Sequence, residues 1–306
     1  MTEIFLKTLP FFGLIGLGWA AAASRFFPPE AAAWLTKFVF YFALSAMLFR
    51  FAAGLDLGAL FDLRFVLAYL AGSTLVWAIG MTVGRWRGLP LSDAAMEAQC
   101  CMTGNTGFLG VPMLVVLLGE RAVGPVLMVL TIDMLVFSTL ITLIVHASRN
   151  GGLRLAAVMP VLRGVAANPM ILSMVAGLGW SWFHLPMPDP AAEFLLLLGA
   201  AATPGALFAI GASLAGRRLK RLAASGWLSL AKLVLHPAAV GIAAWALAVQ
   251  PFAAGVMVAA AALPVAGNVY ILAEYFGVAQ QRVSTTILVS TAVSIVTIPL
   301  VMVLIA

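Results

Sequence analysis

Charged residues are scarce in this sequence. Only 9% of its 306 residues are Asp, Glu, Lys or Arg, while 63% are hydrophobic and the mean hydropathy is +1.10. Soluble proteins carry about 25% charged residues, because they need a large polar surface. Most of the surface of this protein must therefore face lipid. The composition excludes a cytosolic enzyme and a nucleic-acid partner. The net charge of +6 therefore does not indicate nucleic-acid binding.

Cysteine is almost absent as well. The sequence holds only Cys100 and Cys101, which are adjacent. Neighbouring cysteines rarely meet disulfide geometry, and two thiols do not make a metal site. We interpret them as small packing residues, and we predict neither a metal nor a cofactor apart from a coupling ion, H⁺ or Na⁺.

Catalytic motifs are missing too. The chain has no His-Glu-x-x-His zinc motif, no Gly-x-Ser-x-Gly elbow and no paired aspartates on facing hydrophobic runs. These absences argue against an intramembrane enzyme.

Long hydrophobic runs are what the chain offers instead. A crossing helix needs about 20 mostly apolar residues, and Pro, Gly and charge separate runs of that length. We predict an all-α integral membrane protein with ten spans. They cover about 4–24, 33–54, 65–84, 93–118, 121–147, 163–183, 191–215, 225–249, 251–277 and 282–305.

The basic residues predict the orientation, because Lys and Arg near span ends resist translocation. Most fall on one side: Arg25, Lys37, Arg85, Arg87, Arg149, Arg154, Arg163, Arg217, Arg218, Lys220, Arg221 and Arg282. The opposite side has Lys7, Arg50, Arg64 and Arg121. We therefore expect a multi-pass protein of a bacterial inner membrane with both termini on the periplasmic side.

The two halves of the chain resemble each other at an offset of about 160 residues. The matches are Pro10 with Pro169, Gly18-Trp19 with Gly179-Trp180, and 45–49 with 204–208. Five spans is an odd number, so a second copy must enter the membrane from the opposite side. We predict two inverted five-helix repeats, residues 1–150 and 151–306, within one membrane domain. Inverted repeats are typical of secondary transporters.

Spans four and nine are both interrupted near their middle, at 103–112 and 263–270, by Gly, Pro and Asn. A kink or a tight small-residue helix contact is the simpler interpretation. The functional one is that both helices unwind and cross, so that half-helix N-termini hold an anionic group. The candidate substrate-binding residues are Asn105, Thr106, Gly107, Pro264, Gly267, Asn268, Val269 and Tyr270.

The run GNTGFLGVP at 104–112 resembles the crossover of the auxin efflux carrier (PIN-like) family, whose bacterial members include transporters of malonate and related organic anions. Other pieces fit that family: NPMIL at 168–172, LGAAATPGALFAIGASL at 198–214, KLVLHP at 232–237 and LPVAGNVYILAEYFG at 263–277. The resemblance implies ten helices in two inverted repeats, a substrate site where helices four and nine cross, and an elevator-like or rocking mechanism. It also implies a homodimer.

Five ionisable residues within the spans need an explanation, because charge in a membrane is costly. Asp133 is a candidate proton carrier, cation ligand or partner of Lys232, or simply a buried packing group. Lys232 and His236 share one helix face. Lys232 attracts substrate, pairs with Asp133 or extends toward the interface. His236 is a group that can titrate near neutral pH, although a lone histidine is more often a packing residue. Glu97 and Glu274 are interfacial or serve gating or coupling.

Together these features favour a secondary active transporter of small organic anions, such as malonate-like dicarboxylates. The alternative is a sodium- or proton-coupled antiporter or symporter of the same architecture with another substrate, including auxin-like indole acids. Neither the direction of flux nor the coupling ion is evident from the residues. A sodium-coupled protein would be expected to carry acids close to its crossing helices, where this sequence has amides and glycines.

Overall fold

The computed structural model describes residues 2–55, 62–150, 167–216 and 221–305. These residues are almost entirely helical, and their only β pairing is an isolated antiparallel bridge between Gly104 and Val265. The predicted boundary between the repeats and the bases Arg154, Arg163, Arg217, Arg218 and Lys220 lie outside the described residues.

Each of the ten predicted ranges contains helix among its described residues. In the first half they are α1 (Thr2–Ala23), α2 (Pro29–Phe38), α3 (Leu44–Ala53), α5 (Leu63–Trp86), α6 (Leu91–Met102), α7 (Val111–Leu118), α8 (Val123–Ile132) and α9 (Ser138–Asn150). In the second half they are α11 (Pro169–Trp182), α12 (Asp189–Ala200), α13 (Ala202–Leu214), α14 (Leu222–Leu230), α15 (His236–Ala246), α16 (Pro251–Ala261), α17 (Gly267–Tyr275) and α18 (Gln280–Ile305).

Seven helical stretches of the described residues are long and apolar enough to cross a membrane. Their outward side chains suit lipid, because Trp86, Trp245 and Leu304 are each at least 84% exposed. The protein is therefore a multi-pass, all-helical membrane protein. The predicted total of ten crossings and their inverted topology stay predictions.

Short π-helical turns interrupt several of these stretches. They are η1 (Val39–Ala43), η2 (Thr106–Gly110), η4 (Asp133–Phe137) and η6 (Ala231–Leu235). A π turn leaves backbone groups out of the regular ladder and occurs often at functional sites. In η1 the carbonyl of Phe40 accepts a hydrogen bond from Ser45 Oγ, five residues later in the chain. In η4 the carbonyl of Asp133 accepts one from Ser138 Oγ in the same way.

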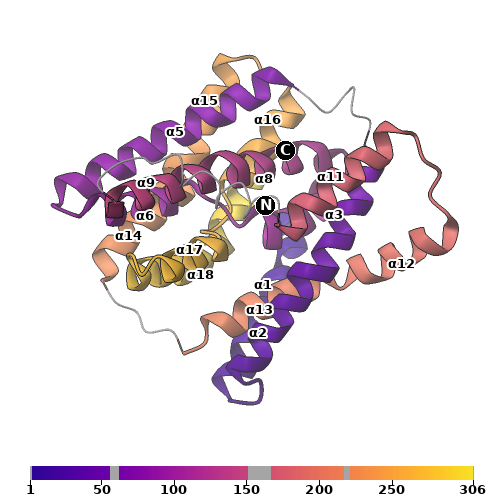
Figure 1. Cartoon of the computed structure of the whole chain (residues 1–306), viewed down its shortest axis with the longest axis horizontal. Helices are drawn as coiled ribbons and strands as arrows, with labels where there is room; N and C mark the ends of the chain where they lie inside the picture. Colours follow the sequence, from indigo (N-terminus) through magenta and orange to yellow (C-terminus); the bar gives the residue numbers. More distant parts are fainter. Residues whose placement is uncertain (1, 56–61, 151–166, 217–220, 306) are drawn as a thin grey trace.

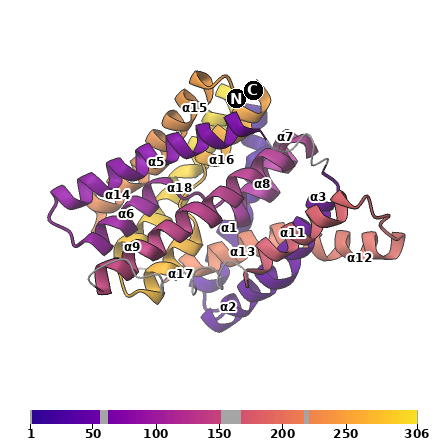
Figure 2. The same ribbon diagram turned by 45° about the horizontal axis from the view of Figure 1, so that its top comes forward.

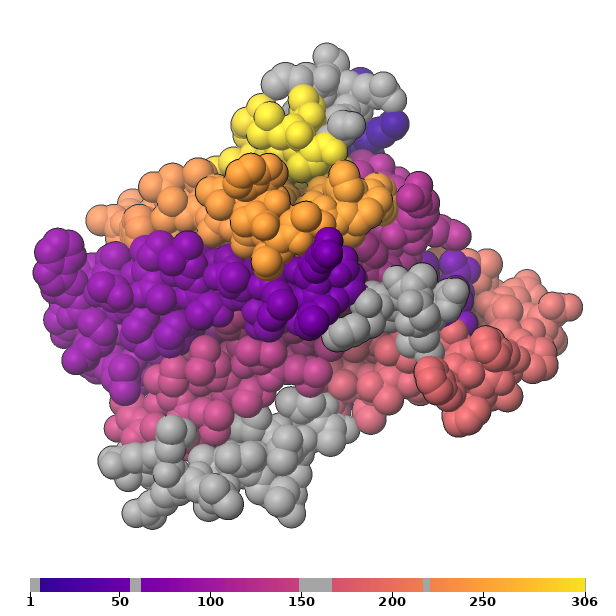
Figure 3. Space-filling view, turned by 90° about the horizontal axis from the view of Figure 1, so that it is seen from above, coloured from indigo at the N-terminus to yellow at the C-terminus, as the bar shows by residue number. Residues whose placement is uncertain are grey.

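The helices form two bundles. The small bundle contains α1, α2, α3, α11, α12 and α13, where α1 packs on α13 and α11 on α3 (Figure 1). The large bundle contains α5, α6, α8, α9 and α14 to α18 (Figure 2). On the face seen in Figure 3, α5 runs beside α15 and α16. Neighbouring spans in sequence thus do not simply pack in order.

Glycines let the helices of the small bundle approach closely. A Cβ atom at Gly18 of α1 would collide with the backbone carbonyl of Phe208 in α13, and one at Gly177 of α11 with that of Phe49 in α3. Adding 159 to the numbers of Gly18 and Phe49 gives Gly177 and Phe208, so the two contacts are equivalent positions of the two halves. The structure thus aligns Gly18 with Gly177. The sequence comparison had aligned Gly18 with Gly179, which has no neighbouring atom within 4 Å.

Candidate functional site

Both predicted interruptions are real breaks in the helix. After α6 ends at Met102, helical structure resumes at Thr106. The second break separates Ala261, the end of α16, from Gly267, the start of α17. Each break leaves a half-helix C-terminus on one side and a half-helix N-terminus on the other. Partial negative and partial positive charge are therefore concentrated around the two breaks.

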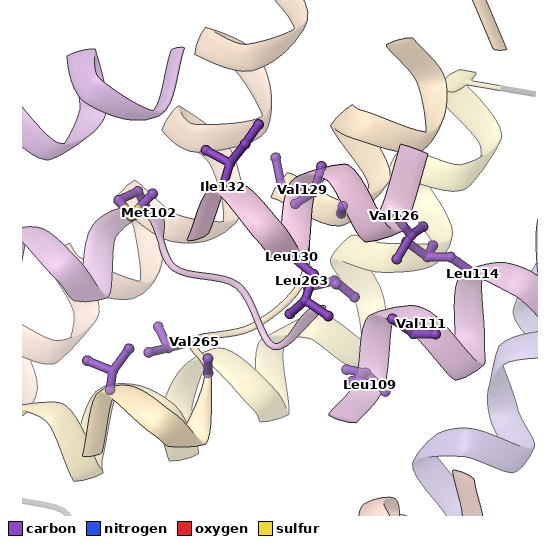
Figure 4. Packing of buried hydrophobic residues seen from close by; sticks show 14 of the residues in the cluster. Met102, Leu109, Val111, Leu114, Val126, Val129, Leu130, Ile132, Leu263 and Val265 are labelled. Carbon is purple, nitrogen blue, oxygen red and sulfur yellow. The ribbon is translucent and has the colours of Figure 1, made fainter. Parts of the chain in front are cut away.

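The two non-helical stretches pair with each other. The Asn105 N–H donates to the carbonyl of Pro264 over 2.8 Å, and the Ala266 N–H donates to the carbonyl of Thr103 over 3.2 Å. Figure 4 shows the stretch after Met102 running beside the one through Leu263 and Val265. Buried backbone groups need partners, and these stretches supply them to one another.

Neighbouring elements tighten this pairing. The Val265 N–H donates to Ser290 Oγ of α18 over 3.1 Å. At Gly104 a Cβ atom would stand 3.0 Å from the carbonyl oxygen of Ala260, which is closer than a side chain tolerates without movement. A larger residue at 104 would therefore require a small shift between this stretch and the end of α16.

A cavity of about 670 Å³ lies against the paired stretches. Its walls come from α2 and η1, from the break and the following turn at 103–108, from α8 to α9, from the start of α11, and from α17. The cavity thus lies between the two bundles and adjoins the N-termini of η2 and α17. Its size is that of a pocket for a small molecule.

The structure brings together four of the predicted site residues on the cavity wall: Asn105, Gly107, Asn268 and Asp133. The other candidates for substrate binding are not on the wall: Thr106, Pro264, Gly267, Val269 and Tyr270. Thr106 and Val269 are 1% exposed, and Pro264 serves through its backbone carbonyl, so these residues build the crossing. Glu97, Lys232, His236 and Glu274 also lie off the wall.

Two cavity-lining side chains have an oxygen without a hydrogen-bond partner among the described residues. These atoms are Asn268 Oδ1 and Asp133 Oδ2. Burying a polar atom without a partner costs free energy, so such atoms suggest a missing ligand, ion or water. The other carboxylate oxygen of Asp133 accepts a hydrogen bond from the Tyr69 hydroxyl over 2.9 Å.

Lys232 does not pair with Asp133, since no ion pair joins these two residues, both of which the structure describes. The Lys232 side chain is fully buried, which excludes the interpretation that it extends toward the interface. Its Nζ donates to the carbonyl of Ala261 and lies 3.1 Å from His236 Nδ1. The opposite ring nitrogen of His236 is 2.9 Å from Ser73 Oγ.

Glu97 belongs to a cluster of ion pairs at the start of α6. Its oxygens lie 2.7 Å from Arg87 Nη1 and 2.8 Å from Arg282 Nε, and Arg282 Nη2 lies 2.6 Å from Asp93. The cluster ties α18 to α6. Glu274, in contrast, is exposed.

Sequence reasoning missed several cavity residues. Ser138, Thr142 and His146 line it and recur every four residues, so they share one face of α9. This four-residue spacing of polar residues was the feature of the sequence that could have identified them. His146 lies near the end of α9, and the bundle turns it to the cavity. Lys37 and Asn168 also line it.

The long apolar helices, the paired breaks and the cavity between two bundles define a membrane transport protein. The chain belongs to the membrane transport protein family, whose model matches residues 3–302. This confirms the resemblance to auxin efflux carriers noted above.

Two relatives are similar over nearly the whole chain. One, from Rhizobium meliloti (strain 1021), is named "Putative malonate transporter"; it is 34% identical over 302 residues, which cover 97% of this chain and 94% of that protein. The other, from Methanothermobacter thermautotrophicus (strain ATCC 29096 / DSM 1053 / JCM 10044 / NBRC 100330 / Delta H), is named "Uncharacterized transporter". It is 26% identical and covers 98% of this chain and 96% of that protein. The chain is therefore a transporter and not an enzyme.

Proposed function

We propose that this protein is a secondary transporter of small organic anions, with malonate-like dicarboxylates as its substrates. The observation that carries the proposal is the cavity wall on which Asn105 and Asn268 meet from opposite halves of the chain. Their amides donate hydrogen bonds, and the adjoining N-termini of η2 and α17 add partial positive charge. A substrate carboxylate can thus accept hydrogen bonds from these groups, and the protein does not need a fully charged side chain for this within the membrane. The name of the Rhizobium meliloti relative supports malonate as the first substrate to test.

The proposed architecture is ten crossings in two inverted five-helix repeats. The equivalent contacts of Gly18 with Phe208 and of Gly177 with Phe49 support it, because a repeat predicts each contact twice. Figure 2 supports an even number of crossings, since the start of α1 and the end of α18 lie at the same side of the molecule.

The proposed mechanism is alternating access, in which the large bundle moves against the small bundle. The cavity has Lys37, His146 and Tyr275 on its wall. These residues stand at span ends that the distribution of bases predicts to be cytoplasmic. We infer a cavity open to the cytoplasm in this conformation, and movement of the bundles would expose the same asparagines to the other side.

The proposed coupling ion is H⁺. Asp133 is the only acidic residue of the described cavity wall. An ionised carboxylate there repels an anionic substrate, whereas a protonated one does not. Binding of substrate and of a proton would thus favour each other.

We further propose a homodimer that forms through α12. Only Gly199 of this helix is buried, while Phe194 and Leu197 are 63% and 68% exposed. Figure 1 shows α12 projecting from the small bundle. Chemical cross-linking in the membrane tests this assembly.

The function is tested by uptake of radiolabelled malonate into proteoliposomes of the purified protein, with liposomes lacking protein as the blank. Unlabelled malonate should compete with the label, and an inward proton gradient should accelerate uptake. A failure of malonate, succinate, lactate and indole acetate to enter, under any imposed gradient, would contradict the proposal.

A further inference from the structure

Two half-helix C-termini adjoin the crossing, and the last helical residue of each lies off the cavity wall. One is the end of α16 at Ala261, and the other is the end of α6 at Met102. Carbonyl groups at a helix C-terminus lack intrahelical partners and carry partial negative charge. Two such ends close together form a place that attracts a cation, as unwound helices do in ion-coupled transporters.

The Lys232 side chain fills this place. Its Nζ donates to the carbonyl of Ala261, the last residue of α16. On the other side, a Cβ atom at Gly104 would stand 3.4 Å from the same Nζ, so the nitrogen lies against the first break. Lys232 is 0% exposed and forms no ion pair with a carboxylate among the described residues.

Local structure aims the lysine inward. Lys232 lies in η6, whose π turn alters the direction of side chains relative to a regular helix. His236, one turn further on, is also 0% exposed and holds the lysine through Nδ1 at 3.1 Å. Ser73 of α5 in turn holds the ring at Nε2. The nitrogen is thus fixed in position by three helical segments.

We propose that Lys232 is a resident cation of the crossing and takes the place that a coupling Na⁺ would occupy. It is a positioning residue, since it acts on the helix ends and not on the cavity. The inference rests on the proposed function and deepens it: transport of the organic anion needs no sodium, and the crossing keeps its shape without a bound metal ion.

The first test compares malonate uptake by wild-type proteoliposomes in sodium, potassium and choline chloride at equal pH and clamped voltage. The rates should be equal in the three salts. Faster uptake in sodium overturns the inference, while transport of the organic anion itself stays supported.

The second test uses a pair of variants. Lys232→Ala leaves space at the helix ends, and Lys232→Met fills that space with an apolar chain of similar length. Both should transport malonate roughly 10- to 100-fold more slowly, because the helix ends lose their cation and shift. Added ethylammonium or Na⁺ should restore transport in Lys232→Ala and not in Lys232→Met. Wild-type rates in Lys232→Met, or equal responses of the two variants to added cations, overturn the inference.

A thermal unfolding measurement on the purified wild-type protein separates the two proposals. A ligand that binds only the folded form raises its unfolding temperature. Sodium chloride should give the same unfolding temperature as choline chloride, and a sodium-specific increase overturns the inference even where malonate is not a substrate or the variants do not fold. Absence of malonate transport with equal unfolding temperatures would count against the proposed function alone.

Discussion

The backbone N–H of Asn105 donates to the carbonyl of Pro264 over 2.8 Å, although 159 positions separate the two residues. This bond joins two interrupted helices, one from each half of the chain. It fixes the main chain of Asn105 and leaves the amide side chain to line the cavity. Backbone pairing and cavity lining are thus divided between different atoms of one residue.

We expect Asn105→Ala and Asn268→Ala each to lower malonate transport at least tenfold while folded protein stays in the membrane. The backbone pairing of Asn105 survives the substitution, but an amide donor to the carboxylate is lost. A hydrogen bond to a charged group contributes about 1.5–3 kcal/mol, so binding should weaken at least tenfold. Uptake of radiolabelled malonate measures this. Gln281→Ala, which removes an exposed amide outside the cavity, is the matched control. Wild-type transport by both asparagine variants would remove the crossing from consideration as the substrate site.

We expect Asp133→Asn to make malonate uptake independent of an imposed proton gradient, because the amide cannot carry a proton. Asp133 lies on the cavity wall and keeps its Tyr69 partner after this isosteric change. Uptake at fixed voltage with and without a pH gradient is the measurement. Asp189→Asn, at an exposed position, should retain the dependence. If Asp133→Asn keeps it as well, Asp133 is not the proton carrier.

We expect Gly18→Ala to destabilise the small bundle by about 1–3 kcal/mol, since its Cβ would collide with the backbone of Phe208. Gly16→Ala in the same helix should be neutral or slightly stabilising, because nothing lies within 4 Å of that position and alanine favours helix. The unfolding temperature in detergent compares the two variants. Equal temperatures would mean that α1 and α13 do not pack at Gly18.

We expect Arg282→Ala to destabilise the protein by on the order of 3 kcal/mol, because Arg282 is 11% exposed and contacts both Glu97 and Asp93. Arg87→Ala should cost less, since the Arg87 side chain is 38% exposed and Glu97 keeps its second partner. Denaturation midpoints in detergent give the order of the two effects. The reverse order would show that Arg282 does not tie α18 to α6.

We expect a cysteine at Glu120 to react with a membrane-impermeant thiol reagent from the periplasmic side and one at Gln280 only from the cytoplasmic side. Both positions are exposed ends of helical segments. The native Cys100 and Cys101 are buried, and replacing both with serine removes background labelling. Labelling of intact cells against inverted vesicles is the measurement. An exchange of the two sides would invert the proposed orientation.

Much of the helical pattern was predictable because lipid imposes a strong constraint on sequence. An apolar run of span length must be helical, and its limits are marked by charge, Pro and Gly. The breaks at 103–105 and 262–266 were predictable for the same reason, since Gly, Pro and Asn weaken a helix wherever they occur. The π turns were not predictable in this way, because their sequences, such as Val39–Ala43 and Ala231–Leu235, share no residue type that marks them.

The amino-acid sequence by itself determined the class of this protein, its helical segments, its two interruptions and the family to which it belongs. These properties depend on local composition and on residues that are near each other in the chain. Only the tertiary structure decided which candidates share a cavity: Asn105 and Asn268 came to the wall, whereas Val269 packed in the core. It also decided that Lys232 binds the end of α16 rather than Asp133. Such contacts depend on how distant helices pack, and periodicity along one helix does not specify its neighbour.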